Sequence, residues 1–219
     1  MTVRLTQGLV ATVLGLTTLA MGHPAWAGPP SDQLRGHVDR VIKVLEDPEL
    51  KREGRIPERR AAIRRIANEI FDFNETTRRS LGQHWQARTP QEREEIVRLY
   101  ADLLERSYIG KIELYSGERI QFVGDTVEGD QATVRTRLVT KAGTEIPVDY
   151  RMHRVSGDRW LAYDVAIEGV SMVANYRAQF NKIIQTSGFR SLVTKLAAKQ
   201  EEGLEADREQ TIRKASQTK

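Results

Sequence analysis

The sequence predicts an α+β fold in which helices precede and follow an antiparallel sheet of four strands. From Ser31 to Tyr115, apolar residues recur every three or four positions, which is the spacing of one face of an amphipathic helix. After Gly117 they alternate with polar residues, as in strands with one buried face, and the helical spacing returns after Ser171. Helices, then strands, then helices are typical of one α+β domain.

Four helices are predicted before the sheet, over residues 31–46, 57–71, 75–85 and 89–115. The last begins with a capping box, in which Thr89 precedes Pro90 and Glu92 stands at the third helical position. At about 1.5 Å per residue, this helix would be about 40 Å long.

Four strands are predicted over residues 119–127, 131–140, 144–155 and 159–167. The short segments between them contain Gly129, Gly143 and Gly157, which are hairpin signals and predict a meander. Pro147 has no amide hydrogen for a strand ladder, so its strand is expected at an edge or with a bulge.

A helix is predicted from Ser171 to Gly188, followed by a last helix over residues 189–199. The helices, above all the long one over residues 89–115 and the one after Ser171, are expected to lie across the buried face of the sheet. Residues 201–219 are polar and are interpreted as a frayed helix or a flexible tail. Residues 28–200 are therefore expected to form a single domain.

The first 27 residues are interpreted as a cleaved signal peptide. Arg4 precedes an apolar stretch from Leu9 to Met21, and Ala25-Trp26-Ala27 is a small-x-small cleavage pattern. A membrane anchor is the alternative, but the apolar run is shorter than the ~20 residues that a span needs. The chain has no cysteine, so neither disulfides nor thiol chemistry are available.

The search for catalytic and metal-binding patterns yields little. His37, His84 and His153 are not at metal-ligand spacing, so no metal site is predicted. Ser171, His153 and Asp164 are of the residue types of a catalytic triad, and Asp164 with Glu168 could serve in acid–base chemistry. The simpler interpretation is that Ser171 caps a helix and the carboxylates satisfy backbone amides.

Binding of nucleic acid is also disfavoured, although the net charge is +4. Aromatic residues do not alternate with Lys or Arg as in a stacking platform. For an exported protein, anionic lipid head groups or an acidic partner would suit a basic chain better. What remains is apolar surface on the sheet and its neighbouring helices, and periodicity does not distinguish a filled core from a hollow one.

The segment "WLAYDVAIEGVSMVANYRAQF" (residues 160–180) resembles the signature of the MlaC family of periplasmic lipid carriers, also called toluene-tolerance proteins. "FDF", "LGQHW", "TPQER" and "SYIGKIELYSGE" follow in the family's order, and the resemblance covers nearly the whole chain after the signal peptide. Two departures are Ile96 and Tyr100, where the family usually has Phe, and the match is loose up to about Gly54.

The resemblance implies a periplasmic phospholipid carrier that has neither enzyme activity nor a cofactor and holds its lipid in an apolar pocket between sheet and helices. Such proteins shuttle lipid between an outer-membrane lipoprotein complex and the MCE-domain subunit of an inner-membrane ABC transporter, and so maintain outer-membrane asymmetry. Two sixteen-carbon acyl chains cost about 25 kcal/mol to expose at ~0.8 kcal/mol per CH₂, so the carrier must bury them.

The residues expected to line this pocket are apolar or aromatic and come from the long helix, the strands and the junction after them: Leu103, Tyr108, Ile112, Phe122, Val134, Val148, Tyr150, Val165, Ile167, Val170, Met172, Val173 and Tyr176. Arg137, Arg151, Arg154 and Arg177 are candidates for contact with the lipid phosphate or with an acidic partner.

Two alternatives remain open on the residues alone. One is an exported enzyme on a cone-shaped α+β scaffold, with Asp164 or Glu168 as general base for a small molecule. The other is a chaperone-like module with an apolar groove for proteins. Lipid that co-purifies with the protein would favour the carrier over both.

Overall fold

The α+β prediction is confirmed by the computed structural model, which describes the chain from residue 28 to residue 217, with side chains to residue 206. Before the sheet, the chain forms α1 (Pro29–Glu46), η1 (Glu53–Arg55), α2 (Ile56–Ile70), α3 (Phe73–Leu81), η2 (Gly82–His84) and α4 (Pro90–Ile112). The sheet consists of β1 (Arg119–Glu128), β2 (Gln131–Val139), β3 (Glu145–Ser156), β4 (Arg159–Ile167) and β5 (Val170–Ser171). Helix α5 (Met172–Gln217) follows.

The sheet is the predicted meander with one further short strand. Its order is β1-β2-β3-β4-β5, and all neighbouring strands are antiparallel. Strand β5 forms because the turn between it and β4 consists of Glu168 and Gly169, both at positive φ (50° and 80°). Positive φ at both central residues is what a tight two-residue hairpin requires, and this reverses the chain before α5 begins.

The prediction that Pro147 lies in an edge strand or at a bulge was wrong, because β3 lies between β2 and β4 and its register shifts fall at Arg151–Met152 and Arg154–Ser156, away from Pro147. Pro147 pairs with Arg137 on β2. The pairing between β3 and β4 does not reach Pro147, because it stops at the next residue of β3, Val148, which pairs with Ile167. On that side the chain has already turned, and the Pro147 carbonyl accepts a hydrogen bond from the amide of Glu168. A missing amide hydrogen is tolerated there because no strand continues alongside.

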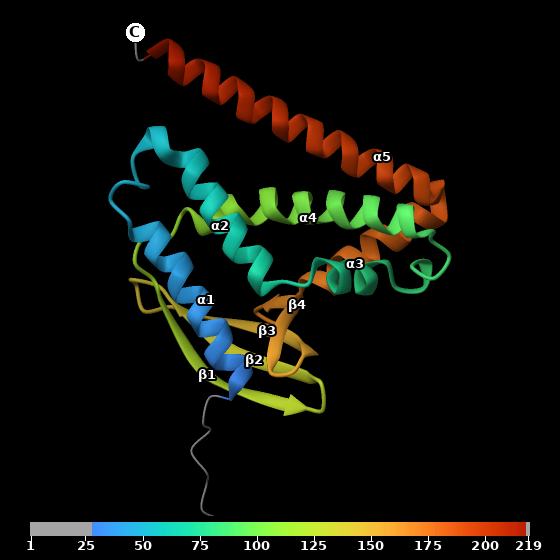
Figure 1. The fold of residues 1–219 in the computed structure, drawn as a ribbon, viewed down its shortest axis with the longest axis horizontal. Helices are drawn as coiled ribbons and strands as arrows, with labels where there is room; N and C mark the ends of the chain where they lie inside the picture. Colours follow the sequence, from blue (N-terminus) through green and yellow to red (C-terminus); the bar gives the residue numbers. More distant parts are fainter. Residues whose placement is uncertain (1–27, 218–219) are drawn as a thin grey trace, which may run out of the picture.

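The two faces of the sheet differ in polarity. Val134, Met152 and Ala162 lie on one face, which we call the apolar face, and pack against Leu34 of α1 and Ile66 of α2. Arg135, Arg137 and Arg151 alternate with these residues and lie exposed on the opposite face, which we call the outer face. Figure 1 shows α1 crossing the sheet, as this packing requires.

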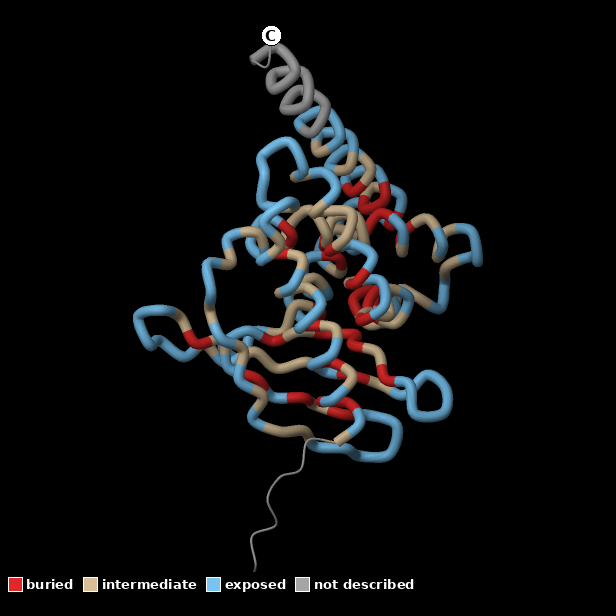
Figure 2. The backbone as a smooth tube through the Cα atoms, turned by 60° about the vertical axis from the view of Figure 1, so that its left-hand side comes forward, coloured by how far each residue is buried: buried red, intermediate tan, exposed pale blue. Residues whose placement is uncertain are grey.

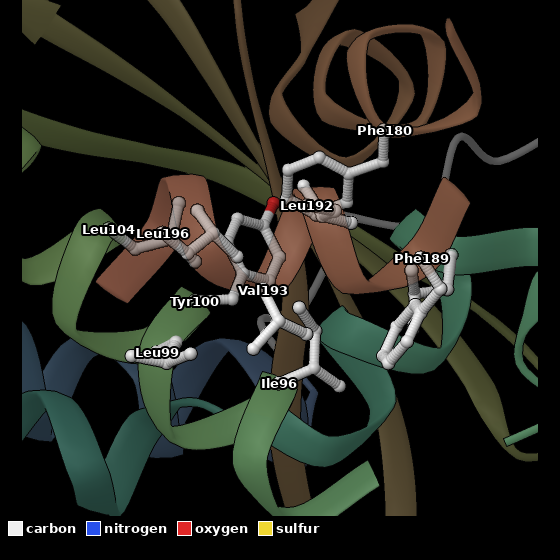
Figure 3. Packing of buried hydrophobic residues seen from close by; sticks show 10 residues of the cluster. Ile96, Leu99, Tyr100, Leu104, Phe180, Phe189, Leu192, Val193 and Leu196 are labelled. Carbon is white, nitrogen blue, oxygen red and sulfur yellow. The ribbon is translucent and has the colours of Figure 1, made fainter. Parts of the chain in front are cut away.

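A second core lies among α3, α4 and α5. Its centre is Tyr100, which is fully buried and packs edge-on against Phe180 with ring centroids 4.9 Å apart. Leu192 and Leu196 of α5 complete this core around Ile96 and Leu104 of α4 (Figure 3). The buried segments accordingly form two zones, one in the sheet and one among the helices above it (Figure 2).

Helix α5 folds back on α4 because it is bent at Gly188. This residue has φ 81° and ψ 165°, which is not helical and is open essentially only to glycine. The predicted separation of two helices at Gly188 is therefore present. The helix then continues to Gln217, through the polar segment interpreted as a frayed or flexible tail.

Capping interactions fix the starts of two further helices. Thr89 and Glu92 form both hydrogen bonds of the predicted capping box at α4. Asp72 caps α3 by accepting from the amide of Glu75 at 2.9 Å. The predicted signal peptide, residues 1–27, lies outside the described residues.

Candidate functional site

The junction from β4 through β5 into α5 is organised around the carboxylate of Asp164, which is fully buried. It accepts hydrogen bonds from the Ser171 hydroxyl at 2.6 Å and from the Val173 amide at 2.9 Å. Arg151 lies 3.3 Å from the same carboxylate. Ser171 in turn accepts from the Ala174 amide at 3.0 Å, as expected for a helix cap. The carboxylate thus holds the first turn of α5 against the sheet.

This arrangement does not resemble a catalytic triad. His153, which would have to lie beside Ser171, instead contacts Asp72 at 3.1 Å through Nε2. Glu168 lies exposed in the β4–β5 turn, whereas the Asp164 carboxylate already accepts hydrogen bonds from the Ser171 hydroxyl and the Val173 amide at the start of α5. Across residues 28–206, no cluster of His, Asp and Glu is placed to hold a metal ion.

The predicted pocket residues of the sheet do share one face. The cross-strand pairs Val134–Tyr150, Tyr150–Val165, Val148–Ile167 and Ile167–Val170 place them all on the apolar face. Val134 is covered by α1 and α2, and Phe122 lies at the border of the same cluster. The others are only partly covered or exposed, and Ile167 and Val170 are 43% and 66% accessible.

We call this partly covered to exposed continuation of the apolar face the apolar patch. It consists of Val148, Tyr150, Val165, Ile167 and Val170. Isolated exposed apolar residues are ordinary, but side chains that adjoin each other across the three strands β3, β4 and β5 form a continuous surface. Such a surface is a candidate for binding an apolar ligand.

The predicted pocket residues of the helices lie elsewhere than expected. Leu103, Tyr108, Met172 and Tyr176 pack around the Tyr100 core, and Val173 is buried beside them at the junction. Because the Val173 amide bonds Asp164, which pairs with Arg151 on the outer face, α5 begins on that side of β4. The expectation that the helix after Ser171 lies across the apolar face was therefore wrong, since α1 and α2 occupy that position.

The two cores meet at the segment between α2 and α3. Phe71 belongs to the border of the sheet core and Phe73 to the border of the helical core, with ring centroids 5.9 Å apart. The chain is anchored there by the Asp72 amide, which donates to the Ala162 carbonyl at 2.9 Å. The motif "FDF" thus links the two halves of the molecule.

Two hollows of about 300 Å³ each are found at the surface. One lies between α4 and α5 and includes Leu103, Arg106 and Gly203. The other lies between α1 and α2 and includes Val44, Ile66 and Arg65. Neither borders the apolar patch, and Leu103 is the one predicted pocket residue that lines either of them.

The four arginines considered for a phosphate contact are not gathered at the apolar patch. Arg137 pairs with Glu145, Arg151 with Asp164 and Arg154 with Asp130, while Arg177 donates to the Arg79 carbonyl at 2.7 Å. Arg137 and Arg151 lie on the outer face, opposite to the patch. The placement of Arg137 opposite to the patch could have been predicted from strand alternation, because odd- and even-numbered residues of β2 point to opposite faces.

Two cations beside predicted pocket residues were missed from the sequence. The Arg35 guanidinium lies 4.2 Å from the ring centroid of Phe122, and Lys111 Nζ lies 5.4 Å from that of Tyr108. Lys111 and Tyr108 are three residues apart on one helix, so that pair was open to prediction. Arg35 and Phe122 come from α1 and β1, and only the tertiary structure brings them together.

Comparison with known proteins gives a match to the family model described as MlaC protein, over residues 35–198. This range covers most of the chain. The chain belongs to the MlaC family. The resemblance stated from the motifs is thereby confirmed.

Two relatives show what this MlaC-family chain is similar to. The intermembrane phospholipid transport system binding protein MlaC of Haemophilus influenzae is 26% identical over 121 residues, which are 53% of this chain and 56% of that protein. The chain thus spans little more than half the length of this curated relative. A solved structure of a phospholipid-binding protein from Ralstonia solanacearum, in complex with a phospholipid, matches with TM-score 0.69 and 24% identity, over 78% of this chain and 96% of that one. This second likeness shows that the fold is shared.

Proposed function

We propose that this protein is a periplasmic phospholipid carrier that binds acyl chains on the apolar patch. The observation that carries the proposal is that the apolar face continues beyond the cover of α1 and α2 as the contiguous side chains of Val148, Tyr150, Val165, Ile167 and Val170. Membership of the MlaC family and the similarity to a phospholipid-bound structure support phospholipid as the occupant.

The patch covers the acyl chains on one side, and a second apolar wall must cover the other. Ile112 and Leu114 at the end of α4 are exposed and supply apolar surface for this wall. Tyr115 beside them packs on the cluster of Leu45, Ile63 and Ile109, which joins α4 to α1 and α2.

No residue of this site is needed for chemistry, so we infer a binding protein and not an enzyme. The carboxylates that an enzyme would use are the buried cap Asp164 and the exposed turn residue Glu168. Among residues 28–217, no helix is long and apolar enough to cross a membrane. We further propose that the carrier is released by cleavage after Ala27 and moves between two membranes.

The experiment that tests the proposal is mass spectrometry of organic extracts from the purified protein. We expect about one glycerophospholipid per chain from the wild type. Val165→Arg places a charge in the centre of the patch and should abolish co-purification, because a charged group is costly beside acyl chains. Val123→Arg is the matched control, since Val123 is 48% exposed on β1 and outside the patch.

Lipid-free wild-type protein, or equal lipid in Val165→Arg and the wild type with both variants folded, would contradict the proposal. Circular dichroism of each variant establishes folding, so that loss of lipid is not confused with loss of structure.

For the partners, we propose exchange of lipid with the MCE-domain subunit of an inner-membrane ABC transporter and with an outer-membrane lipoprotein complex. The name of the Haemophilus influenzae relative, a binding protein of an intermembrane phospholipid transport system, supports this step. Transfer of labelled phospholipid between this protein and each purified complex from the same organism would test it, and no transfer with either complex would contradict it.

A further inference from the structure

Tyr150 is the one polar residue of the apolar patch. It lies in the middle of β3, with Val134 and Val165 as its cross-strand neighbours. Val148 and Met152 flank it along the strand on the same face. Its side chain thus has four apolar neighbours, and its hydroxyl is the one polar side-chain atom of the patch.

This hydroxyl differs from those of two other tyrosines in the same protein. The Tyr100 hydroxyl shares a 3.2 Å hydrogen bond with Ser80, and the Tyr115 hydroxyl donates to Glu46 at 3.2 Å. For Tyr150, no hydrogen-bond partner is present within residues 28–206. The hydroxyl is not closed off from solvent, because among residues 28–206 the buried side-chain polar atoms without a partner are Ser31 Oγ and Arg88 Nε, and it is therefore accessible to a ligand.

The hydroxyl is also held as a neutral donor. Burial raises the pKa of Tyr150 to about 12, and no neighbouring charge contributes to this shift. Arg151, next in sequence, points to the outer face and contacts Asp164. A site without a cation is poorly suited to a phosphate, which prefers Arg or Lys. A neutral carbonyl oxygen is a suitable acceptor for a single neutral hydroxyl.

We propose that the Tyr150 hydroxyl donates a hydrogen bond to an ester carbonyl of the bound glycerophospholipid, and so fixes how deep the acyl chains lie on the patch. This inference rests on the proposed function. Ester carbonyls are the polar atoms nearest the acyl chains, so a hydroxyl within an apolar patch reaches them before it reaches the head group. The role is one of ligand positioning.

The test compares two lipids that differ only at this acceptor, dipalmitoyl phosphatidylethanolamine and its dihexadecyl ether analogue, which has no carbonyl oxygens. Their affinities are measured by displacement of a fluorescent phospholipid from the delipidated protein. We expect the wild type to favour the ester by about twofold to tenfold, the range of one net hydrogen bond. Tyr150→Phe should lose this preference by binding the ester more weakly and the ether unchanged.

Tyr115→Phe is the matched control, because it removes a tyrosine hydroxyl that already has a protein partner outside the patch. It should keep the wild-type preference. Thermal unfolding of the lipid-free protein gives a second readout. Tyr150→Phe should not lower Tm, because no bond is lost, whereas Tyr100→Phe should lower it by leaving the buried Ser80 without its partner.

Equal affinity of the wild type for ester and ether, or equal loss of both in Tyr150→Phe, would overturn the ester contact while leaving the carrier proposal intact. A lower Tm of lipid-free Tyr150→Phe would also overturn it. Failure of the wild type to bind either lipid would instead overturn the proposed function itself.

Discussion

The hydroxyl of Ser171 donates a 2.6 Å hydrogen bond to the buried carboxylate of Asp164, seven residues earlier in the chain. Between them the chain reverses at Glu168 and Gly169. The same carboxylate accepts from the amide of Val173, so one side chain of the sheet holds both β5 and the start of α5. This contact therefore fixes where α5 starts on the sheet.

We expect Asp164→Asn to lower the free energy of unfolding by about 2–3 kcal/mol, because the amide replaces one acceptor oxygen with a donor and removes the charge. Urea unfolding measures this. Arg151→Gln is the control, since the Arg151 side chain is half-exposed and its pair with Asp164 should contribute about 0–1 kcal/mol. If both substitutions had the same effect, the ion pair and not the helix cap would be the important contact.

Gly188→Ala tests whether the bend in α5 is required. At φ 81° and ψ 165°, a side chain is strained by about 1–3 kcal/mol, and the strain opposes the return of Phe189 and Leu192 to α4. Thermal unfolding should therefore give a lower Tm. Gly110→Ala is the matched control within a regular part of α4, where a Cβ meets no atom within 4 Å, and it should raise stability slightly. A neutral Gly188→Ala would show that the bend is not needed.

The stability of α3 should depend on pH through Glu75. Hydrogen bonds from Arg78 and then Arg79 outweigh burial and lower the pKa of Glu75 to about 2. A folded pKa below the unfolded value of about 4.3 means that the contribution is present above pH ~4.3 and is lost as the pH falls towards 2. The difference in unfolding free energy between the wild type and Glu75→Gln should therefore shrink over this window. A difference in unfolding free energy that does not change with pH would show that folding does not lower the pKa of Glu75.

Val173→Arg should act differently from Val165→Arg. Val173 is only 4% exposed, and its amide is bonded to Asp164. An arginine there buries an unpaired charge and should cost several kcal/mol, so we expect loss of cooperative unfolding as well as of bound lipid. Val165 is half-buried at the patch, and Val165→Arg should keep a cooperative transition. Similar stability of the two variants would mean that Val173 can leave the core without cost.

The sequence by itself determined the elements of this fold and several of their ends. The capping box at Thr89, the hairpins at Gly129 and Gly157 and the break at Gly188 are local signals, and each was recognised because short-range sterics and hydrogen bonds fix them. Strand alternation likewise placed Val134, Tyr150 and Val165 on one face. The motifs also identified the family.

Only the tertiary structure decided which helices cover that face. An apolar stripe shows that one face of a helix is buried. It does not show which element covers that face, because this is decided by packing between segments that are distant in the sequence. α1 and α2 took the place expected for the helix after Ser171, because Asp164 holds the start of α5 on the other side of β4. That contact, and the isolation of the Tyr150 hydroxyl among apolar neighbours, depend on residues that are distant in sequence or paired across strands, and no local pattern specifies them.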